Sequence, residues 1–387
     1  MRPEISENNS KRIMIITGES SGDLHGSHLI RAAAEQYPEM SFFGVGGKRM
    51  VAAGCQLIFS SDELAVMGVW EVAAQFYGIF RRFKQLKRIL QGPEAPDALV
   101  LIDFPDFNLR LAKVAKKLGI AVLYYITPKV WAWRKKRAKV IAENTDQLAL
   151  IFPFEPDIFR PFGVAAEYVG NPLLDEYVNN RPKGDLRARL GIGGEEQVVG
   201  IFPGSRKSEI TYILDSLVET AKLIHRDKPG AKFLLPVAPS LDADIFHTRL
   251  NGCGIPIFIL EENIYEVAHA CNAVLCVSGT VTLQLALTGT PMAILYKIAP
   301  LSYAIGKHLV KVEHVGLTNI IAGREIVREF IQDAASPDAM QDEIIRLLDD
   351  DVYTNQMRNN LQEVKLLLGE PGCSGKVAKL VHELVTK

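Results

Sequence analysis

The sequence has few cysteines, and they are not spaced as a disulfide framework or a zinc site requires. There are five, an odd number, and they form no CxxC pair. That usage indicates a reduced, cytoplasmic protein. The sequence also lacks a run of about 18 apolar residues, which a membrane-spanning helix needs. Its polar start, MRPEISENNSKR, lacks the apolar core of a signal peptide. We therefore expect any membrane contact to be peripheral.

An excess of charge of either sign is missing as well. Lys and Arg number 44 against 45 Asp and Glu, a net charge of −1. Without a general positive field the protein is not expected to bind nucleic acid, and an anionic partner would need a local basic patch. Hydrophobic residues at 48% and charged residues at 23% exclude a disordered or fibrous chain. The length of 387 residues predicts two or three domains.

What is present is a repeated pattern of short apolar runs and helical segments. Such alternation is typical of parallel α/β sheets. Proline and glycine gather between residues 153 and 185, which predicts a domain boundary there. Because ligands of such sheets bind at the carboxyl ends of the strands, the residues after each run are the candidates for chemistry. The predicted strands are 12–17, 41–45, 98–103, 120–126 and 147–152 in the first half, and 197–202, 232–237, 256–260, 273–277 and 292–296 in the second.

The turn from Gly18 to Asp23 follows the first predicted strand and opens a helix expected near 23–36. Glycine-bearing turns at helix N-termini favour anions, yet this one is not GxGxxG and has no P-loop lysine. Glu19 stands where a phosphate would otherwise bind, so the turn points to a hydroxyl-rich ligand. The alternative is a tight turn in which Asp23 caps the helix.

Two carboxylates follow the predicted strand at 98–103 and have different expected roles. Asp103 ends the strand and should face the ligand side of the sheet, where aromatic neighbours can raise its pKa enough for it to act as a general base. Asp106 follows Pro105 at the start of a helical pattern, which is a good position for an N-cap. We assign Asp103 to chemistry and Asp106 to structure.

Two segments combine aromatic and basic residues. Trp131 and Trp133 precede four successive cations that begin at Arg134. That combination can bind nucleic acid, lipid phosphate or sugar phosphate, or can be a solvated helix end, and the net charge argues against nucleic acid. Residues 70–91 place apolar side chains at helical spacing between five cations. This pattern fits either a helix at a membrane interface or a helix packed on its own sheet.

In the second half, two predicted strands lead into turns of small residues that open helices. The first turn carries an arginine, which makes it a candidate diphosphate clamp. The second offers free backbone N–H groups to an anion, and Gln284, one turn further, can reach a ribose. The sequence has no dense cluster of aspartates that would suggest a metal. The two turns are Gly204–Ser205–Arg206, after the strand at 197–202, and Ser278–Gly279–Thr280, after the strand at 273–277.

Several unusual strings of this sequence, taken together, resemble the lipid-A-disaccharide synthase family, from about residue 12 to the C-terminus. They are GESSGD, ELAVMG, DFPDFN, TPKVWAWRKKR, FPGSR, SGTVTLQ and LTNIIAGRE. The resemblance implies the GT-B fold, an α/β architecture of two doubly wound Rossmann-like domains facing a central cleft, with a C-terminal helical segment. The expected parts are an acceptor-binding domain at 1–170, a UDP-sugar-binding domain at 171–345, and a helical segment at 346–387 that returns to the first domain.

The resemblance further implies an inverting glycosyl transfer. UDP-2,3-diacylglucosamine would be the donor and 2,3-diacylglucosamine 1-phosphate the acceptor, and the products would be the β-1′,6-linked disaccharide 1-phosphate and UDP. Neither a cofactor nor a metal is expected, since enzymes of this fold generally use arginine and helix dipoles in place of a metal. The protein would be cytoplasmic and peripheral on anionic lipid at the inner face of the cytoplasmic membrane. A homo-oligomer is left open.

The residues that match the family's motifs are expected to form the site. Gln284 departs from the family, which usually has Glu there to hold the ribose hydroxyls. Because a neutral amide accepts a weaker hydrogen bond, restoring Glu should tighten UDP binding unless the neighbours have adapted to the amide. The expected catalytic residues are Asp103, Arg206 and Glu19; the donor-binding residues are Gly204, Ser205, Arg206, Ser278, Gly279, Thr280 and Gln284; the acceptor-binding residues are Ser21, Asp103, Trp131, Arg134, Asn319 and Arg324.

Two other functions remain open on the sequence alone. One is another UDP-GlcNAc enzyme of the same fold, a transferase or an epimerase, although the strings GESSGD, DFPDFN and WAWRKKR speak against it. The other is a UDP-sugar-binding protein without activity, whose donor site has decayed at Gln284. Analysis of the products separates these functions from disaccharide synthesis.

Overall fold

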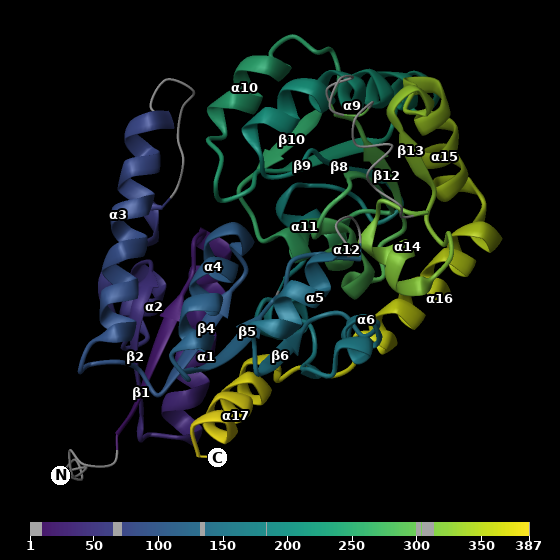
Figure 1. The fold of residues 1–387 in the computed structure, drawn as a ribbon. Helices are drawn as coiled ribbons and strands as arrows, with labels where there is room; N and C mark the ends of the chain where they lie inside the picture. The colour runs from purple at the N-terminus through teal and green to yellow at the C-terminus, as the bar shows by residue number, and fades with distance from the viewer. Residues whose placement is uncertain are drawn as a thin grey trace, which may run out of the picture. The chain divides into compact units, whose positions relative to one another are not determined.

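The computed structural model describes residues 10–64, 72–131, 136–182, 184–298, 303 and 313–386, and for 72–77 and 207–209 it describes the backbone alone. The chain forms two compact units. The first unit comprises residues 1–172 together with 371–387, and the second comprises residues 173–370. Each unit is built around one parallel β-sheet (Figure 1).

The sheet of the first unit has seven strands in the order β3-β2-β1-β4-β5-β6-β7. Its central strands are continuous apolar runs. All of Ile13 to Ile16 in β1 are fully buried, as expected when helices cover both faces of a parallel sheet. The strand order reverses between β1 and β4, which pair directly. The strands are β1 (Lys11–Ile16), β2 (Met40–Gly46), β3 (Gln56–Ser60), β4 (Ala98–Ile102), β5 (Ala121–Tyr125), β6 (Gln147–Leu150) and β7 (Ala165–Tyr168).

Helices cover both faces of this sheet. The core on one face includes Tyr124 and is covered by α3, α4, α5 and α6. The core on the other face includes Tyr125 and is covered by α1, α2 and α17. The two tyrosines serve opposite faces because side chains alternate along a strand. The helices are α1 (Ser20–Gln36), α2 (Lys48–Ala52), α3 (Val72–Gln91), α4 (Pro105–Lys117), α5 (Lys136–Glu143), α6 (Glu155–Phe159) and α17 (Cys373–Thr386), with 3-10 turns at Ser61–Glu63 and Arg160–Phe162.

The last helix of the chain belongs to the first unit. α17 packs against α1 and β5, and it lies beside α1 in Figure 1. Its first residue, Cys373, is fully buried and its thiol lies 3.3 Å from the Tyr125 hydroxyl. The segment 346–387, expected as a single part, is thus divided between the two units, and the division falls at the turn 369–372.

The sheet of the second unit has six strands in the order β10-β9-β8-β11-β12-β13. Here the order reverses between β8 and β11, which also pair directly. The strands are β8 (Val198–Phe202), β9 (Lys232–Pro236), β10 (Ile257–Leu260), β11 (Ala273–Val277), β12 (Met292–Tyr296) and β13 (Glu329–Ile331). The helices are α7 (Pro172–Asn179), α8 (Leu186–Arg189), α9 (Lys207–Asp227), α10 (Asp244–Leu250), α11 (Ile264–Ala270), α12 (Val281–Thr288), α14 (Leu317–Ala322), α15 (Pro337–Asp349) and α16 (Asp351–Leu367), with a 3-10 turn at Gln332–Ala334.

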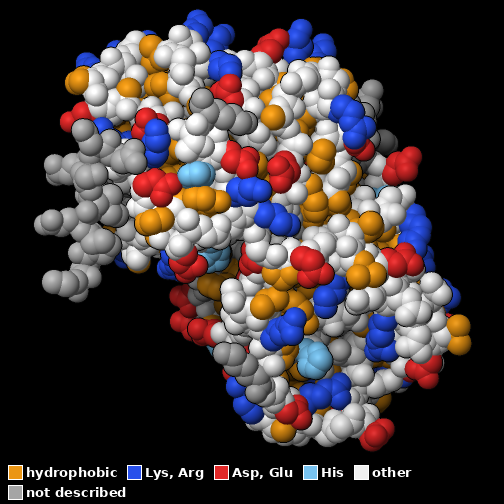
Figure 2. All heavy atoms as spheres, turned by 90° about the horizontal axis from the view of Figure 1, so that it is seen from below, with side chains coloured by type: hydrophobic (Ala, Val, Ile, Leu, Met, Phe, Trp, Pro, Cys, Tyr) orange, Lys and Arg blue, Asp and Glu red, His pale blue; other side chains and the backbone are white. Residues whose placement is uncertain are grey.

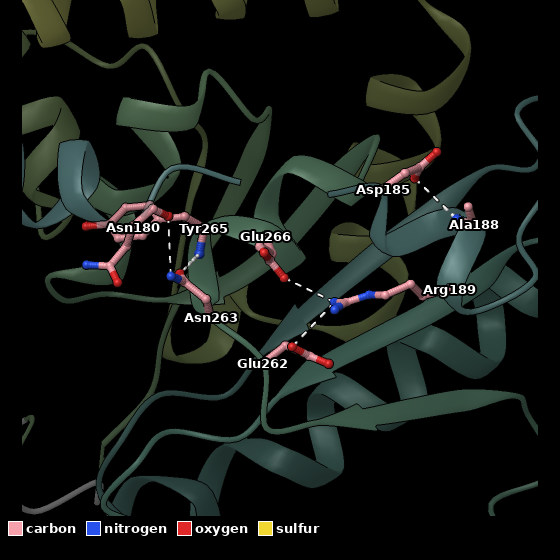
Figure 3. A network of polar contacts seen from close by, with 8 residues as sticks. All are labelled: Asn180, Asp185, Ala188, Arg189, Glu262, Asn263, Tyr265 and Glu266. Carbon is pink, nitrogen blue, oxygen red and sulfur yellow. Dashed lines mark hydrogen bonds and ion pairs between the residues drawn. The ribbon is translucent and has the colours of Figure 1, made fainter. Parts of the chain in front are cut away.

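A polar network fixes the first part of the second unit (Figure 3). Arg189 of α8 is ion-paired with Glu266 of α11 at 3.1 Å. Asn263, the N-cap of α11, accepts a hydrogen bond from the Tyr265 N–H at 2.9 Å and donates one to the Asn180 carbonyl at 3.3 Å. The chain that follows α7 is therefore held against α11 of the same unit.

The sequence prediction of the strands is largely confirmed. All ten predicted strands are present within two residues of their predicted bounds, and the first helix begins three residues earlier than expected, at Ser20. β3, β7 and β13 are missing from the prediction. Each is an edge strand, and β7, with the sequence AAEY, has no buried apolar run because one side of an edge strand has no neighbour.

The surface carries charges of both signs. On the face shown in Figure 2, the coloured basic and acidic side chains lie interspersed, as the net charge of −1 suggests. A local excess of positive charge occurs on α3, where Arg81, Lys84, Lys87 and Arg88 are exposed. In the parts of the chain that the structure describes, no helix is long and apolar enough to span a membrane.

Candidate active site

The predicted residues of the first half meet where the strand order of the first sheet reverses. β1 and β4 end side by side there, and such a switch point is where open parallel sheets bind ligands. Glu19 and Ser21, both exposed, follow β1, and Asp103 follows β4. The two turns touch, because a Cβ atom on Gly18 would lie 2.2 Å from the Phe104 ring. Position 18 must therefore be glycine for this packing.

The backbone at Asp103 is held in an unusual conformation. Asp103 and Phe104 have φ angles of 46° and 50°, in the left-handed region that non-glycine residues rarely adopt. The Asp103 carbonyl accepts hydrogen bonds from the Asn108 amide and the Tyr124 hydroxyl, both at 2.7 Å. These buried donors stabilise a turn that costs about 1–3 kcal/mol per strained residue. Backbone strain of this kind is concentrated at functional sites, so this turn is a strong candidate for part of the active site.

The electrostatic surroundings of Asp103 suit a general base. Burial raises the pKa of its carboxyl, and the nearby Glu19 carboxylate raises it further, while the Phe104 N–H and the Lys129 ammonium lower it. A raised pKa makes the ionised carboxylate a better proton acceptor. Lys129 lies in the TPKVWAWRKKR string but is not among the predicted site residues, because the prediction rests on the tryptophans and the arginine of that string.

Asp106 does not cap its helix, so that prediction is wrong. α4 has Phe104 at its N-cap position and Asp106 within its first turn. The Asp106 side chain is exposed and forms an ion pair with Arg137 of α5. Pro105 occupies the first helical position, as its fixed φ favours, and Asp106 therefore lies two residues past the N-cap position at Phe104. Its role remains structural, between two helices.

Asp23, in contrast, is a capping residue, but for a different helix from the one expected. It lies in the first turn of α1, whose N-cap position is Glu19. Its buried carboxylate accepts hydrogen bonds from the N–H groups of Gly47, Arg49 and Met50 at 2.7, 3.1 and 3.1 Å. These N–H groups lie at the N-terminus of α2. Asp23 thus joins α1 to α2, a long-range contact that local sequence spacing does not show.

Trp131 lies after β5 and has a partner that the sequence analysis missed. Its indole Nε1 donates to the Glu155 carboxylate at 3.3 Å. Glu155 is 1% exposed, and it also accepts from the N–H groups of Ile151 and Phe152. Glu155 begins α6, five residues after the end of β6 at Leu150, so its position in the segment after a strand is a signal for it. The prolines around it pointed only to a domain boundary. Arg134 lies outside the described residues.

The turn after β8, which is predicted to bind the donor, is partly exposed. Gly204 has a φ of +92°, which favours glycine. Ser205 is exposed, and its carbonyl accepts from the Ser240 hydroxyl at 3.0 Å. Arg206 is exposed at the N-cap position of α9, so a positively charged residue stands at the helix N-terminus. That combination is suited to an anion.

The turn after β11 lies beside the turn after β8, since β8 and β11 are neighbours at the switch point. Ser278 donates to the Val315 carbonyl at 2.7 Å and so fixes the turn. A Cβ atom on Gly279 would meet no other atom within 4 Å, and Thr280 is exposed at the N-cap position of α12. These residues leave room for a ligand at the start of α12.

Gln284 is not an isolated amide. Its Nε2 donates to the Glu176 carboxylate of α7 at 3.2 Å, within the second unit. Burial raises the pKa of Glu176, and the hydrogen bond from Gln284 lowers it. A carboxylate is therefore present beside position 284, and the amide is its hydrogen-bond donor. A neutral residue at position 284 is compatible with this neighbouring carboxylate.

Asn319 and Arg324 use their polar groups within the second unit. The Asn319 amide is fully buried, donates to the Val327 carbonyl at 2.7 Å and the Glu329 carboxylate at 2.8 Å, and accepts from the N–H of Val327 at 3.0 Å. Arg324 is ion-paired with Glu363 of α16 at 2.7 Å. Both residues shape the segment around α14, and direct contact with a substrate remains a prediction.

The described part of residues 70–91 packs on its own sheet by one face. Leu86 and Leu90 of α3 are buried in the core. On the other face Phe80 is 54% exposed, with the Lys84 ammonium 4.5 Å from its ring centroid. Residues 70 and 71, and the side chains of 72–77, lie outside the described part. A groove of about 530 Å³ on this helix is lined by Phe80, Arg81, Arg82, Lys84, Gln85 and Arg88.

Comparison with known proteins decides the family. The family described as lipid-A-disaccharide synthetase matches residues 13–378. The chain belongs to this family. The lipid-A-disaccharide synthase of Syntrophotalea carbinolica is 51% identical over 374 residues, which cover 97% of this chain and 95% of that protein. The lipid-A-disaccharide synthase of Geobacter metallireducens is 45% identical over 379 residues, which cover 98% of each. The resemblance of the sequence strings to the lipid-A-disaccharide synthase family is confirmed.

Solved structures confirm the fold of this family member as GT-B. A UDP-N-acetylglucosamine 2-epimerase from Neisseria meningitidis bound to UDP-GlcNAc aligns with a TM-score of 0.63 at 10% identity, over 97% of this chain and 99% of that one. The glycosyltransferase of kitacinnamycin aligns with a TM-score of 0.60 at 15% identity, over 97% and 99%. Epimerases and transferases share this fold, so it is membership of the lipid-A-disaccharide synthetase family that makes the chain a glycosyltransferase.

Proposed function

We propose that this family member transfers a 2,3-diacylglucosaminyl group from UDP to the 6-hydroxyl of 2,3-diacylglucosamine 1-phosphate, with inversion at the anomeric carbon. The family match over nearly the whole chain supports lipid A disaccharide synthesis. The observation that carries the chemistry is Asp103, a strained, partly buried carboxylate with a raised pKa at the switch point of the first sheet.

In the proposed step, the Asp103 carboxylate takes the proton of the acceptor 6-hydroxyl as that oxygen attacks the anomeric carbon of the donor. The bond from the anomeric carbon to the diphosphate oxygen breaks, and UDP leaves with the electron pair. Arg206 and the N-termini of α9 and α12 bind the negative charge that develops on the diphosphate. Because these fixed positive groups stabilise the charge of the leaving diphosphate as a metal cation would, we propose that no metal is needed.

The test is to incubate the protein with both diacylated sugars in detergent and to analyse the lipids by mass spectrometry. We expect the disaccharide 1-phosphate and an equal amount of UDP, and we expect EDTA to leave the rate unchanged. Formation of an epimerised UDP-sugar without disaccharide, or UDP binding without turnover, would contradict the proposal. Restoration of an EDTA-inhibited rate by magnesium would contradict the metal-free step.

We further propose that the protein contacts anionic membrane through the exposed face of α3. Both substrates carry two acyl chains, so a soluble enzyme must meet them at a lipid surface or in a micelle. The support is the exposed Phe80 among exposed cations, which combines apolar and positive surface on one helix.

Ser21, Asp103 and Trp131 of the first unit are proposed to bind the acceptor. The turns after β8 and β11 are proposed to bind the donor.

A further inference from the structure

A buried carboxylate lies at the edge of the candidate site and takes no part in the proposed step. Glu155 begins α6, the first helix after β6, and is 1% exposed. Burial raises its pKa to about 7, and the hydrogen bonds and the nearby Lys129 ammonium oppose that rise. A buried acid normally destabilises a protein unless every lone pair is used. Its presence therefore needs a reason beyond packing.

The partners of Glu155 come from two neighbouring strand ends. One oxygen accepts from the N–H groups of Ile151 at 3.2 Å and Phe152 at 3.0 Å, at the end of β6. The other accepts from the Trp131 indole at 3.3 Å, after β5. β5 pairs with β6, and also with β4, which ends at Asp103. Glu155 thus ties the segment beside the proposed base to the turn of the next strand.

Aromatic contacts complete the fixation of Trp131. Its ring stands edge-on to Phe154 at 5.4 Å and to Phe152 at 6.0 Å, with interplanar angles of 85° and 89°. The two phenylalanine rings are stacked on each other at 5.7 Å. These ring contacts hold the indole in a single orientation only when its N–H is also hydrogen-bonded. Glu155 supplies that bond, and no described residue other than Glu155 is hydrogen-bonded to this indole.

We propose that Glu155 is a positioning residue for the acceptor: its hydrogen bond to the indole fixes Trp131 as a rigid wall of the site that receives the diacylated glucosamine 1-phosphate. This inference rests on the proposed function, in which Trp131 binds the acceptor. The carboxylate acts through Trp131 and does not touch the reacting atoms. It should therefore govern acceptor binding and leave donor binding alone.

The experiment compares Glu155→Gln, Trp131→Phe and the double variant in the disaccharide assay. Each single variant should raise the acceptor KM about tenfold, the loss expected for one hydrogen bond to a charged group. The donor KM should stay within about twofold. The amide of Glu155→Gln has one acceptor oxygen in place of two, so it cannot accept from both the indole and the two backbone N–H groups. Because both single variants disrupt the same contact between Trp131 and Glu155, the double variant should be no worse than the more affected single one. Additive effects, or an unchanged acceptor KM in a folded variant, would overturn the proposal.

A matched control separates positioning from loss of stability. Glu343 of α15 is likewise 2% exposed and accepts from an aromatic side chain, the Tyr353 hydroxyl, at 2.6 Å. Glu343→Gln should lower the Tm but leave both KM values unchanged. If Glu343→Gln also raised the acceptor KM, the effect of Glu155→Gln would be one of general stability and the proposal would fall.

A second readout does not depend on turnover. The exchange rate of the Trp131 indole proton, followed by NMR on the full chain, should rise at least about tenfold in Glu155→Gln. An unchanged rate would show that the tether is absent and would overturn the inference even if the enzyme is active. If the wild-type protein formed no disaccharide while its Trp131 indole proton exchanged slowly, the proposed function would be overturned instead. The hydrogen bond between Trp131 and Glu155 would still be supported.

Discussion

At the scale of single residues, the base assignment gives a direct prediction. Asp103→Asn should lower kcat by about 10²–10⁴-fold with little change in Tm, since the amide keeps the size of the side chain. Asp106→Asn removes an exposed ion pair with Arg137, so it should cost at most about 1 kcal/mol of stability and leave kcat within about threefold. Steady-state kinetics and thermal melts of both variants test this prediction. A large loss of kcat in Asp106→Asn, with little change in Asp103→Asn, would show that the two roles are exchanged.

The pH profile offers an independent check on Asp103. The base must be ionised to accept a proton, and burial and Glu19 raise its pKa above the ordinary value of 3.8. The rate should therefore fall on the acid side through that raised pKa. Glu19→Gln removes the carboxylate charge that helps to raise the pKa of Asp103, so it should move the acid limb of the kcat–pH profile to lower pH. An acid limb that stays in place would show that another group titrates.

A second residue-scale prediction concerns the pair of Gln284 and Glu176. The sequence alone suggested that Gln284→Glu would tighten UDP binding. The structure reverses that expectation, because the new carboxylate would lie about 3 Å from the Glu176 carboxylate. We expect UDP to bind about tenfold more weakly, measured by titration calorimetry. Adding Glu176→Gln exchanges the acid and the amide, and should restore binding; tighter binding by Gln284→Glu alone would contradict the pairing.

Glu155 makes stability depend on pH. Its pKa is raised from the ordinary value of 4.5 to about 7 by burial. A raised carboxyl pKa adds stability that is fully present below pH 4.5 and is lost as the pH rises through 7. The difference in unfolding free energy between wild type and Glu155→Gln should thus fall by about 3 kcal/mol over that range. Denaturant unfolding at several pH values measures it, and a constant difference would mean that Glu155 is ionised without penalty.

At the scale of elements, α3 makes the membrane proposal testable. Arg82 is ion-paired with Glu63, so we leave it unchanged. Replacing Arg81, Lys84 and Arg88 with Gln should release the protein from anionic vesicles, since each cation near such a surface contributes about 1 kcal/mol. The matched control removes three exposed cations of α1 and α17, which cover the opposite face of the same sheet: Arg31, Lys376 and Lys379. Equal sedimentation of all three proteins would refute the α3 contact.

Elements also show what the sequence can and cannot predict. Strands buried on both faces, such as β1 and β11, are continuous apolar runs and are found from the sequence alone. Edge strands are found only where they are apolar: β10, with the sequence IFIL, is predicted, whereas β7, with the sequence AAEY, is not. Among site residues, Asp103 follows from its place after a strand. The partnership of Trp131 with Glu155, and that of Gln284 with Glu176, joins segments whose contact only the folded chain creates.

At the scale of the whole molecule, the position of α17 predicts the effect of shortening the chain. Ending the protein at residue 370 removes Cys373, Val377, Ala378 and Val381 from one core of the first unit. Burying such side chains contributes about 1.5–3 kcal/mol for each larger one, comparable to the whole stability of a domain. We expect the first unit to be degraded in limited proteolysis while residues 173–370 stay protected by UDP. Resistance of the first unit in the shortened chain would refute this.

The same helix orders events during synthesis of the protein. The first unit begins with residues that leave the ribosome early, yet the core that α1 and α2 cover on one face of its sheet stays incomplete until residues 373–386 of α17 have emerged. The second unit is encoded entirely between these two parts, so it can complete its own sheet first. Domains usually fold in the order in which they are made. Here α17 reverses that order, because the unit with the proposed base is complete only after residues 373–386 have been made.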